Sequence, residues 1–324
     1  EVLILEYGVD KKGDMDFLLS IVRPDIAVLT NVFPVHMNDD QFKTLDDIYN
    51  EKRKLVDGLK DHGVAILNID NEYCAELAKK RGKKSTITYG KAENADFRAT
   101  SVQIGRDGLN FILHYDDKKQ SVSTGTLGEY HVYVFLPAII CGVLLGMPIE
   151  NVVFSLTKYA SPPGRLNLIQ GVNDSVILDS SYNSSPAPLK EALKVLKEIG
   201  GNDRKIAVLG SMNELGEYSH ALHREIGKLI PKYADLLITV GEDAKVFGTE
   251  ALAHGFEVTQ VLSFDSPNDA AEAFKEKIKP GDIFLVKGSQ NKVRLEKFIK
   301  IIMANPQDAQ KLLVRQENVW EDIF

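Results

Sequence analysis

The sequence predicts an α/β fold of two domains: a partial parallel sheet with a small antiparallel meander, followed by a Rossmann-like, doubly wound domain. Three observations predict it. The chain has 324 residues, which is long enough for two separate cores. Short β-rich runs alternate twice with amphipathic helical patterns. Pro162-Pro163-Gly164 separates the two series, because paired prolines and a glycine end any helix.

The first series predicts parallel strands with covering helices. We expect strands at residues 2–5, 25–30, 63–68 and 85–90, with helices at 15–22 and 45–59. A period of two then predicts an antiparallel meander at 97–105, 109–115 and 119–125, with Asp107-Gly108 as a tight hairpin turn. Two helices follow, at 130–145 and 149–159.

The second series has the alternation of a doubly wound sheet. Strands are expected at 166–171, 175–179, 205–210, 235–241, 257–262 and 282–289, with helices between them and after the last. These patterns predict a first domain over residues 1–160 and a second over 161–304. The remainder, 305–324, carries the only tryptophan, Trp320, and is expected to pack back as a short helix.

Composition favours a cytoplasmic globular protein that binds small molecules. The net charge of −7 argues against a nucleic-acid partner, which needs a basic surface. Cys74 and Cys141 form no metal-binding or CxxC pattern, so two free thiols in a reducing compartment are expected. No signal peptide is visible. The apolar run at 132–147 is shorter than a membrane span of roughly 20 residues and contains Pro137, so it is interpreted as a buried helix.

The beginning of the chain carries an expectation of its own. Glu1 is followed at once by an apolar, strand-like run and is not preceded by a methionine. Because domains seldom start within a strand, we expect a segment before Glu1 to be missing.

Polar residues follow several predicted strands, at the edge where open α/β sheets bind ligands. Glu6 follows the first strand, and its carboxylate suits Mg²⁺, which prefers oxygen ligands. His36 follows the second, although a single histidine is more often a surface or hydrogen-bonded residue. Lys52 lies on the next helix and by itself resembles an ordinary solvated charge.

In the second domain, polar side chains occur after three strands. Asp179-Ser180-Ser181-Tyr182-Asn183 follows one strand, Ser211 to Glu217 follows the next, and Lys287-Gly288-Ser289 ends the last. Each alone could be a helix N-cap; several on one edge favour a binding site. There is no G-x-G-x-x-G dinucleotide motif after a strand and no G-x-x-x-x-G-K-[ST] phosphate loop.

Six stretches, in order and spanning almost the whole chain, resemble the Mur ligase family, and in particular its MurF branch. They are LEYGVDKKGDM (Leu5–Met15), LTNVFPVHM (Leu29–Met37), PPGRLN (Pro162–Asn167), LDSSYNSSP (Leu178–Pro186), LGSMNELGEYSHALHREIG (Leu209–Gly227) and VKGSQNKVRLE (Val286–Glu296). The resemblance implies the later part of a central ATPase domain and a complete C-terminal domain. The phosphate loop would then belong to the expected missing segment.

The resemblance also implies roles for the polar residues. Arg165 would reach the phosphates of ATP, Asp179 would contact the nucleotide, Tyr182 would lie along adenosine and Asn183 would fix the loop. Metal positions for Mg²⁺ are implied at Glu6, His36 and Lys52, the last as a carbamylated lysine. Catalytic roles fall to Lys52, His36 and Arg165, and nucleotide contact also to His131. The binding site of the incoming dipeptide would be lined by Asn213, Glu214, His223, Lys287 and Ser289.

The implied reaction is ATP-dependent amide-bond formation in peptidoglycan precursor synthesis. A carboxylate of a UDP-muramoyl tripeptide is phosphorylated by ATP, and the amine of D-Ala-D-Ala then attacks the acyl phosphate. The implied partners are these small molecules, without nucleic acid or membrane insertion, and the protein is expected to be a monomer. The fragment is expected to be inactive alone.

Some positions depart from the family pattern. The helix near Gly128 usually reads G-x-H-N-x-x-N, but here both asparagine positions are filled otherwise, by His131 and Val134. Ser180 and Ser211 stand where aspartates are common, and Gln290 replaces a frequent arginine. Two alternatives stand: a non-catalytic, partner-binding remnant, because a chain without a phosphate loop should not hydrolyse ATP, and another ligase of the superfamily, of MurE or folylpolyglutamate type. The SYN and ELGE patterns speak against the second.

Overall fold

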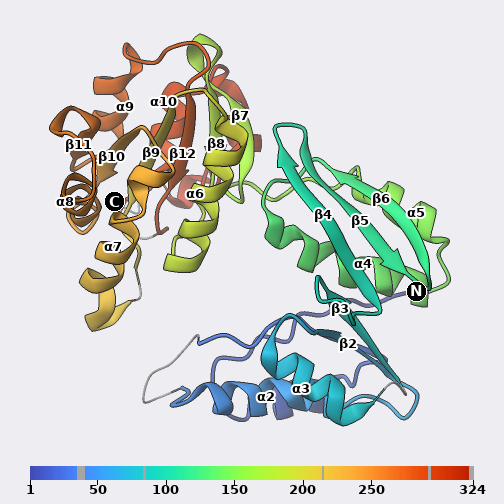
Figure 1. Ribbon diagram of the computed structural model, residues 1–324. Coiled ribbons are helices and arrows are strands. Elements are labelled where there is room, and N and C mark those ends of the chain that lie inside the picture. Colours follow the sequence, from blue (N-terminus) through green and yellow to red (C-terminus); the bar gives the residue numbers. More distant parts are fainter. Residues whose placement is uncertain (35–40, 83–84, 214, 291–292, 321–324) are drawn as a thin grey trace. The chain divides into compact units, whose positions relative to one another are not determined.

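The protein is described by a computed structural model that covers residues 1–34, 41–82, 85–213, 215–290 and 293–320. It forms two compact units (Figure 1). The first consists of Glu1–Gln103, Leu109–Thr124 and Glu129–Lys158, and the second of Ile104–Gly108, Gly125–Gly128 and Tyr159–Phe324. Each unit is an α/β structure around its own sheet, in agreement with the fold class predicted from the sequence.

The first unit contains a sheet in the order β1-β2-β3-β4-β5-β6. The neighbouring strands from β1 to β4 are parallel, whereas β5 and β6 are antiparallel. Figure 1 shows α2 and α3 beside β2 and β3. The bounds are β1 Ile26–Leu29, β2 Val64–Asn68, β3 Thr86–Gly90, β4 Phe97–Gly105, β5 Gly108–Tyr115, β6 Lys118–Thr124, α1 Asp14–Ile21, α2 Leu45–Asp57, α3 Glu72–Arg81, α4 Val132–Leu144 and α5 Ile149–Leu156.

Local sequence explains where α2 begins and which side of it is buried. Thr44 caps the helix by accepting a hydrogen bond from the backbone N–H of Asp47, whose carboxylate accepts one from the Thr44 N–H in return. This reciprocal capping box satisfies two donors that the first helical turn leaves free. The apolar side of the helix buries Ile48 and Val56 in a core shared with Leu67.

The strand expected at residues 2–5 is not formed. Residues 1–9 lack regular structure, and the Ile4 side chain is 89% exposed. A strand requires a hydrogen-bonded neighbour, and in the described sheet β1 is the edge strand, paired only with β2. The run therefore has β-forming residues without a partner strand. The turn after β4 also differs slightly, because Gly108 opens β5 instead of lying within the turn.

The second unit contains a sheet in the order β11-β10-β9-β12-β8-β7. All its neighbouring strands are parallel except β7, which is antiparallel to β8. The strands are β7 Asn167–Gln170, β8 Val176–Asp179, β9 Lys205–Gly210, β10 Leu236–Val240, β11 Val261–Phe264 and β12 Ile283–Lys287. The helices are α6 Pro186–Gly200, α7 Ser219–Gly227, α8 Lys245–Ala253, α9 Pro267–Lys275, α10 Glu296–Ile302 and α11 Ala309–Leu312.

Successive side chains of the central strands point alternately into two hydrophobic cores, one on each face of this sheet. In β9, Ala207 and Leu209 pack with α6, α7 and α8, while Ile206 and Val208 pack with α9 and α10. Figure 1 shows α6 and α7 on the opposite side of the sheet from α9 and α10. This two-sided burial is the physical basis of the doubly wound arrangement, since successive strand residues point to opposite faces.

Two details of the second unit differ from, or refine, the expectation. The strand expected at 257–262 begins only at Val261, because Glu257 and Gln260 form a capping box around a short 3-10 turn. In the tail, α11 is the expected short helix, and it packs back onto the unit because Ala309 and Leu313 belong to the core on the α9–α10 side.

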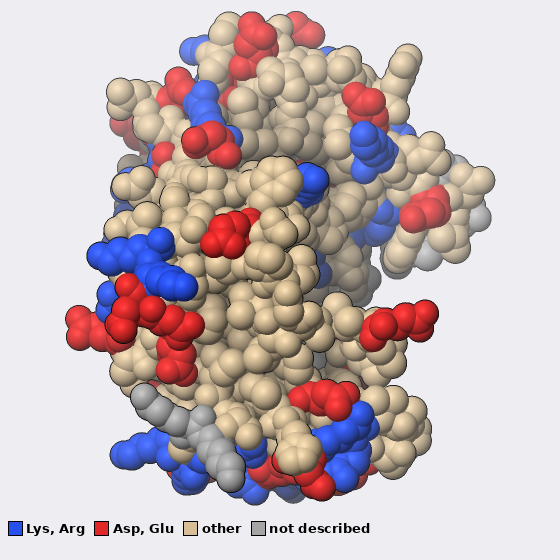
Figure 2. Space-filling model, turned by 90° about the vertical axis from the view of Figure 1, so that its right-hand side faces the viewer, with Lys and Arg blue, Asp and Glu red and all other residues tan. Residues whose placement is uncertain are grey.

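The surface and the helices bear on the classes of partner. On the face in Figure 2, basic and acidic side chains are interspersed, and neither sign covers a continuous area. Within the described ranges, every helix is too short or too polar to traverse a lipid bilayer. Most of the apolar run at 132–147 forms α4, which ends at Leu144 and whose buried residues include Phe135 and Ile139. The buried-helix interpretation of that run is confirmed.

Candidate functional site

The loop after β8, residues Asp179 to Ser184, occupies the carboxyl edge of the second sheet. Its polar residues are mostly buried: Asp179 has no exposed surface, and Ser181 and Ser184 are 1% and 3% exposed. The loop folds back on itself, because the Ser181 backbone N–H donates to Asp179 Oδ1 at 2.9 Å. The Ser180 N–H donates to the carbonyl of Val286 in β12 at 2.9 Å. The polar stretch is therefore a structured loop.

Asp179 is the most unusual carboxyl group of this loop. Burial raises its pKa to about 6, against the opposing effect of hydrogen bonds from Ser181 and the Gly164 backbone. Among the described protein atoms, Asp179 Oδ2 has no hydrogen-bond partner, and neither do the hydroxyl oxygens of Ser181 and Ser184. Buried polar atoms normally find partners, so the loop offers three groups that a ligand or water can satisfy.

The segment that precedes β7 packs against the same loop. The Tyr182 N–H donates to the Gly164 carbonyl at 3.2 Å, and Gly164 has a φ of 72°. The Arg165 guanidinium lies over the Tyr182 ring, with its Cζ 4.1 Å from the ring centroid. Tyr182 remains 39% exposed. A stacked guanidinium and a half-exposed aromatic ring thus form one surface, to which a base and a phosphate can both bind.

Lys287 lies at the end of β12, and its ammonium group is turned toward the protein interior. It is 4% exposed and donates to the Ser180 hydroxyl at 3.1 Å and to the Asn183 carbonyl at 2.7 Å. Burial and, to a lesser extent, the nearby Arg165 charge lower its pKa to about 8, whereas Asp179 acts in the opposite direction. Lys287 therefore holds the β8 loop from behind.

Ser289 connects two loops. Its hydroxyl donates to the Ser184 carbonyl at 3.1 Å and accepts from the Asn213 N–H at 2.8 Å. Its own N–H donates to the Ser211 carbonyl at 2.9 Å. The loops after β8 and β9 are thereby tied together through the end of β12, so the polar residues predicted after these three strands do lie together.

His223 was expected to line the dipeptide site, but the structure places it in the core. It has no exposed surface and packs against Phe247 at a centroid distance of 4.8 Å. Its Nε2 accepts from the Met212 N–H at 2.9 Å, while Nδ1 lies 2.8 Å from the Ser219 carbonyl. Both ring nitrogens are thus used by the backbone, and burial lowers the pKa of the imidazole. His223 therefore supports the β9 loop, and its place in a dipeptide site stays a prediction.

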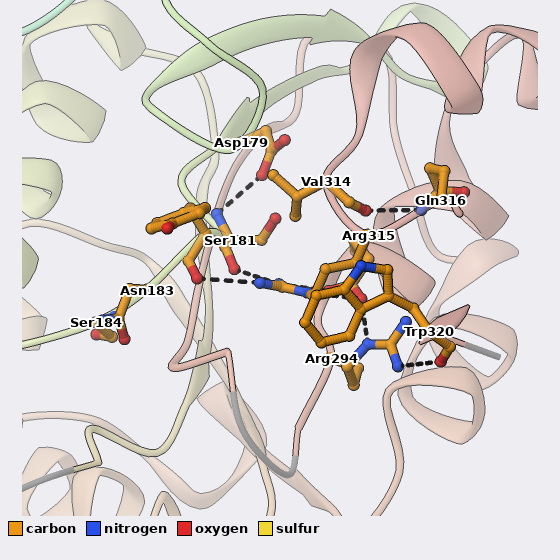
Figure 3. A network of polar contacts seen from close by, with 11 residues as sticks. Asp179, Ser181, Asn183, Ser184, Arg294, Val314, Arg315, Gln316 and Trp320 are labelled. Atoms are coloured by element: carbon orange, nitrogen blue, oxygen red, sulfur yellow. Dashed lines mark hydrogen bonds and ion pairs between the residues drawn. The ribbon is translucent and has the colours of Figure 1, made fainter. Parts of the chain in front are cut away.

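Three buried charged residues beside the β8 loop were not singled out from the sequence: Arg294, Glu296 and Arg315. Figure 3 shows Arg315 reaching from the tail to Ser181, with Arg294 and Trp320 nearby. The Arg315 guanidinium contacts both Glu296 oxygens, at 3.1 and 2.8 Å, and Arg294 binds the same carboxylate. Arg294 and Glu296 lie in the stretch Val286–Glu296 that carries the family resemblance, whereas Arg315 follows no strand and lies in no quoted stretch, so it gave no sequence signal.

In the first unit, the expected residues are placed as follows. Lys52 is partly buried on α2, and burial lowers its pKa, with a small opposing effect from Cys74. Glu6 is exposed on the irregular first segment. His131 is 4% exposed and stacks with Tyr130 at a centroid distance of 4.2 Å. His36, like Glu214 of the second unit, lies outside the described residues.

A bound Mg²⁺ does not fit the described residues by themselves. Across the ranges that the structure covers, no three His, Cys, Asp or Glu side chains come together in a way that could hold a metal ion. Glu6 contributes a single exposed carboxylate, whereas a protein site for a hard cation needs several oxygen ligands. The metal roles of Glu6, His36 and Lys52 therefore stay predictions, and no chemical step is derived from them.

Two shallow hollows, of about 380 and 430 Å³, lie away from these residues. Lys60, Asp61 and Gly63 line both, directly before β2 begins. Both hollows thus lie at the amino ends of the strands of the first sheet, whereas ligands of open α/β sheets bind beyond the carboxyl ends. Their position argues against a role as the main binding site.

Comparison with known proteins gives two domain matches. A family model described as the Mur ligase middle domain matches residues 1–142, and one described as the Mur ligase, glutamate ligase domain matches residues 164–290. The two matched ranges follow each other along the chain with the segment around Pro162-Pro163 between them.

Similar curated proteins are UDP-N-acetylmuramoyl-tripeptide–D-alanyl-D-alanine ligases. The relative from Bacillus subtilis is 30% identical over 307 residues, covering 94% of this chain and 65% of the relative. The one from Escherichia coli is 27% identical over 248 residues, covering 76% and 54%. The chain thus spans less than two thirds of the length of these relatives.

Similar solved structures are those of MurF proteins. A crystal structure of MurF from Acinetobacter baumannii has a TM-score of 0.78 at 25% identity, covering 93% of this chain and 64% of that one. MurF from Thermotoga maritima in complex with ADP has a TM-score of 0.75 at 23% identity, covering 96% and 68%. At 23% identity, the likeness to the Thermotoga maritima structure shows a shared fold alone.

Proposed function

The chain belongs to the Mur ligase family, and from this premise we propose that it is the central and C-terminal part of an ATP-dependent ligase that joins D-Ala-D-Ala to a UDP-N-acetylmuramoyl tripeptide. The observation that carries the proposal is the structured β8 loop, which combines a buried Asp179 with the Arg165–Tyr182 surface at the carboxyl edge of the sheet. We further propose that the protein acts in the cytoplasm, where ATP is available, and that it acts as a monomer.

The reaction balances in two steps. A carboxylate oxygen of the tripeptide forms a bond to the γ-phosphorus of ATP, and the bond from that phosphorus to the bridging oxygen breaks, so ADP leaves. The dipeptide amine then forms a C–N bond at the acyl carbon, loses a proton, and inorganic phosphate departs. A carboxylate is otherwise a poor electrophile at neutral pH, so the phosphorylation step provides the required activation.

We assign roles to this chain's residues from their surroundings. Arg165 offers a permanent planar cation beside Tyr182, suited to phosphate oxygens on which charge accumulates. Tyr182 presents an exposed ring face for the adenosine part, and Asn183 is exposed beside it. Asp179 Oδ2 is left for a hydrogen-bond donor of the nucleotide. His131 is the proposed nucleotide contact in the first unit.

On the dipeptide side we propose contact by Asn213 and the neighbouring Glu214. The Asn213 backbone is held by Ser289. Lys287 and Ser289 support this side by anchoring loop carbonyls, and their own polar atoms are engaged in that work. In this proposal the dipeptide meets the loop after β9, whose position Ser289 fixes through the Asn213 N–H.

The ligase activity is tested by phosphate release from the product of the intact gene. Release should require both the UDP-muramoyl tripeptide and D-Ala-D-Ala. Arg165→Met should lower kcat/KM for ATP by a factor on the order of 100, because a charge-assisted contact to the phosphates is lost. Arg224→Met is the matched control, since Arg224 is half-exposed and pairs with Glu250. Phosphate release that is independent of the dipeptide contradicts the proposal.

Lys52 is proposed to be carbamylated. Its amine is partly buried with a lowered pKa, and among the described residues no carboxylate pairs with it. A neutral amine adds to CO₂ and releases a proton, which gives an anionic carbamate. With ¹³C-bicarbonate, the protein should show a carbamate carbon signal that Lys52→Arg lacks, while a Lys54→Arg control retains it because Lys54 is paired with Asp16 and Glu51. An identical spectrum for wild type and Lys52→Arg contradicts the modification.

A further inference from the structure

The backbone of the β8 loop is held by side chains from distant parts of the chain. The carbonyls of Ser181 and Tyr182 accept hydrogen bonds from Arg315, at 2.8 and 3.1 Å. The next two carbonyls, those of Asn183 and Ser184, accept from Lys287 and Ser289. Successive carbonyls of a loop without regular structure are thus each oriented by a side chain, and the exposed side chains of the loop are oriented with them.

Arg315 makes its contacts from the C-terminal tail. It is 8% exposed, and the tail is anchored on both sides of it: Ala309 and Leu313 lie in the core, and Arg294 donates to the Trp320 carbonyl at 2.7 Å. Val314, next to it, also approaches Gly164, because a Cβ added to Gly164 would lie 3.0 Å from the Val314 side chain. The tail therefore touches both segments that form the Arg165–Tyr182 surface.

Glu296 holds the Arg315 guanidinium in its orientation. The carboxylate is 1% exposed. Burial acts to raise its pKa, but hydrogen bonds from Arg315 and Arg294 outweigh it, so the pKa lies below the ordinary value. One edge of the Arg315 guanidinium is thus occupied by a buried anion while the remaining N–H groups point at the loop carbonyls. A planar fork with fixed donors suits this double task, and lysine does not.

We propose that Arg315 is a positioning residue for nucleotide binding, which makes the C-terminal tail part of the nucleotide site. The inference rests on the proposed function. Arg315 acts through the Ser181 and Tyr182 backbone: it keeps the Tyr182 ring beneath Arg165 and keeps Asp179 in its buried position. Its loss should impair the binding of ATP far more than the binding of the dipeptide or the chemical step.

The test compares Arg315→Met with Arg294→Met in the product of the intact gene. Both variants remove one guanidinium from Glu296, but Arg294 also donates to the tail, at the Trp320 carbonyl, whereas Arg315 holds the β8 loop. Arg315→Met should raise KM for ATP by about tenfold, as expected for the loss of hydrogen bonds from a charged group, with KM for the dipeptide and kcat within about threefold. Arg294→Met removes one anchor of the tail but keeps the Arg315 contacts to the loop, so it should raise KM for ATP less than Arg315→Met does and leave KM for the dipeptide and kcat within about threefold.

A second measurement does not depend on activity. Hydrogen exchange of the amides of Ser181 and Tyr182, which are bonded to Asp179 and Gly164, should accelerate at least about tenfold in Arg315→Met. It should accelerate less in Arg294→Met. Equal exchange in both variants overturns the positioning role and leaves the proposed ligase function untouched. Faster exchange with an unchanged KM for ATP overturns instead the assignment of this loop to the nucleotide, and the inference with it.

Discussion

Asp179 combines complete burial with a carboxyl oxygen that no described protein group satisfies. Such a group stays in a folded protein only where its surroundings hold it, as the Ser181 N–H and the Gly164 segment do here. The cost of keeping it buried depends on pH, because its pKa is raised to about 6 from an ordinary value of 3.8. The folded protein binds the Asp179 proton more tightly than the unfolded chain does.

This shift predicts how Asp179→Asn changes stability. Asp179 favours folding at pH below about 4, and that contribution is lost as pH rises through about 6. Asparagine keeps the acceptor for the Ser181 N–H but does not ionise. Relative to wild type, the variant should therefore gain up to about 3 kcal/mol in free energy of unfolding between pH 4 and pH 7.5. Urea unfolding at the two pH values measures this, and an equal difference at both values contradicts it.

Lys287, at the same edge of the sheet, affects the pH dependence of stability with the opposite sign. Its folded pKa of about 8 lies below the ordinary value of 10.5, so its burial costs stability below pH 8, and that cost fades as pH rises toward 10.5. Its ammonium group donates to Ser180 and Asn183 of the loop. Lys287 thus supports the backbone of the β8 loop, and its predicted contact with the dipeptide stays a prediction.

At the scale of elements, the site depends on a close approach of two segments that flank β7 and β8. Gly164 has a φ of 72°, and an added Cβ would lie 2.8 Å from the Tyr182 backbone nitrogen. Glycine is required here both for the left-handed conformation and for the contact. The approach brings Arg165 over the Tyr182 ring, so the surface that binds the nucleotide in our proposal is set by this one glycine.

Gly164→Ala should therefore be more harmful than alanine at another glycine of positive φ. Gly13 is left-handed, with a φ of 95°, and a Cβ added there would meet no atom within 4 Å, so its substitution isolates the backbone strain, on the order of 1–2 kcal/mol. Gly164→Ala should cost at least about 1 kcal/mol more in thermal unfolding and should also raise KM for ATP. If the two glycine variants are equally destabilised and KM for ATP is unchanged, the functional importance of the close approach between Gly164 and Tyr182 is contradicted.

At the scale of the whole molecule, each unit has its own core and sheet. The first buries the apolar sides of its helices around Ile48 and Leu67, and the second covers both faces of a six-stranded sheet. The candidate site residues of the second unit come from the segment before β7 and from the loops after β8, β9 and β12, to which our proposal adds the tail. This distribution follows the general rule for open α/β sheets, with the tail as an addition.

The sequence by itself determined the fold class, most of the strands and helices, and the edge at which polar residues gather. These follow from local periodicity, caps and turn residues, which act over a few neighbouring positions. Residues 2–5 show where such reasoning fails, because a β-forming run becomes a strand only when a partner strand is adjacent. The roles of His36 and Glu214 lie outside the described residues and stay predictions.

Only the tertiary structure decided how the site residues are used. Arg315 contacts Ser181 across 134 positions of sequence, and Lys287 reaches Asn183 across 104. His223 is occupied by backbone groups that only folding brings to both of its nitrogens. Periodicity carries no information on contacts at such separations, because they depend on how whole elements pack. The sequence therefore places the polar loops at one edge of a sheet, and packing determines which of their atoms are held and which are left for a ligand.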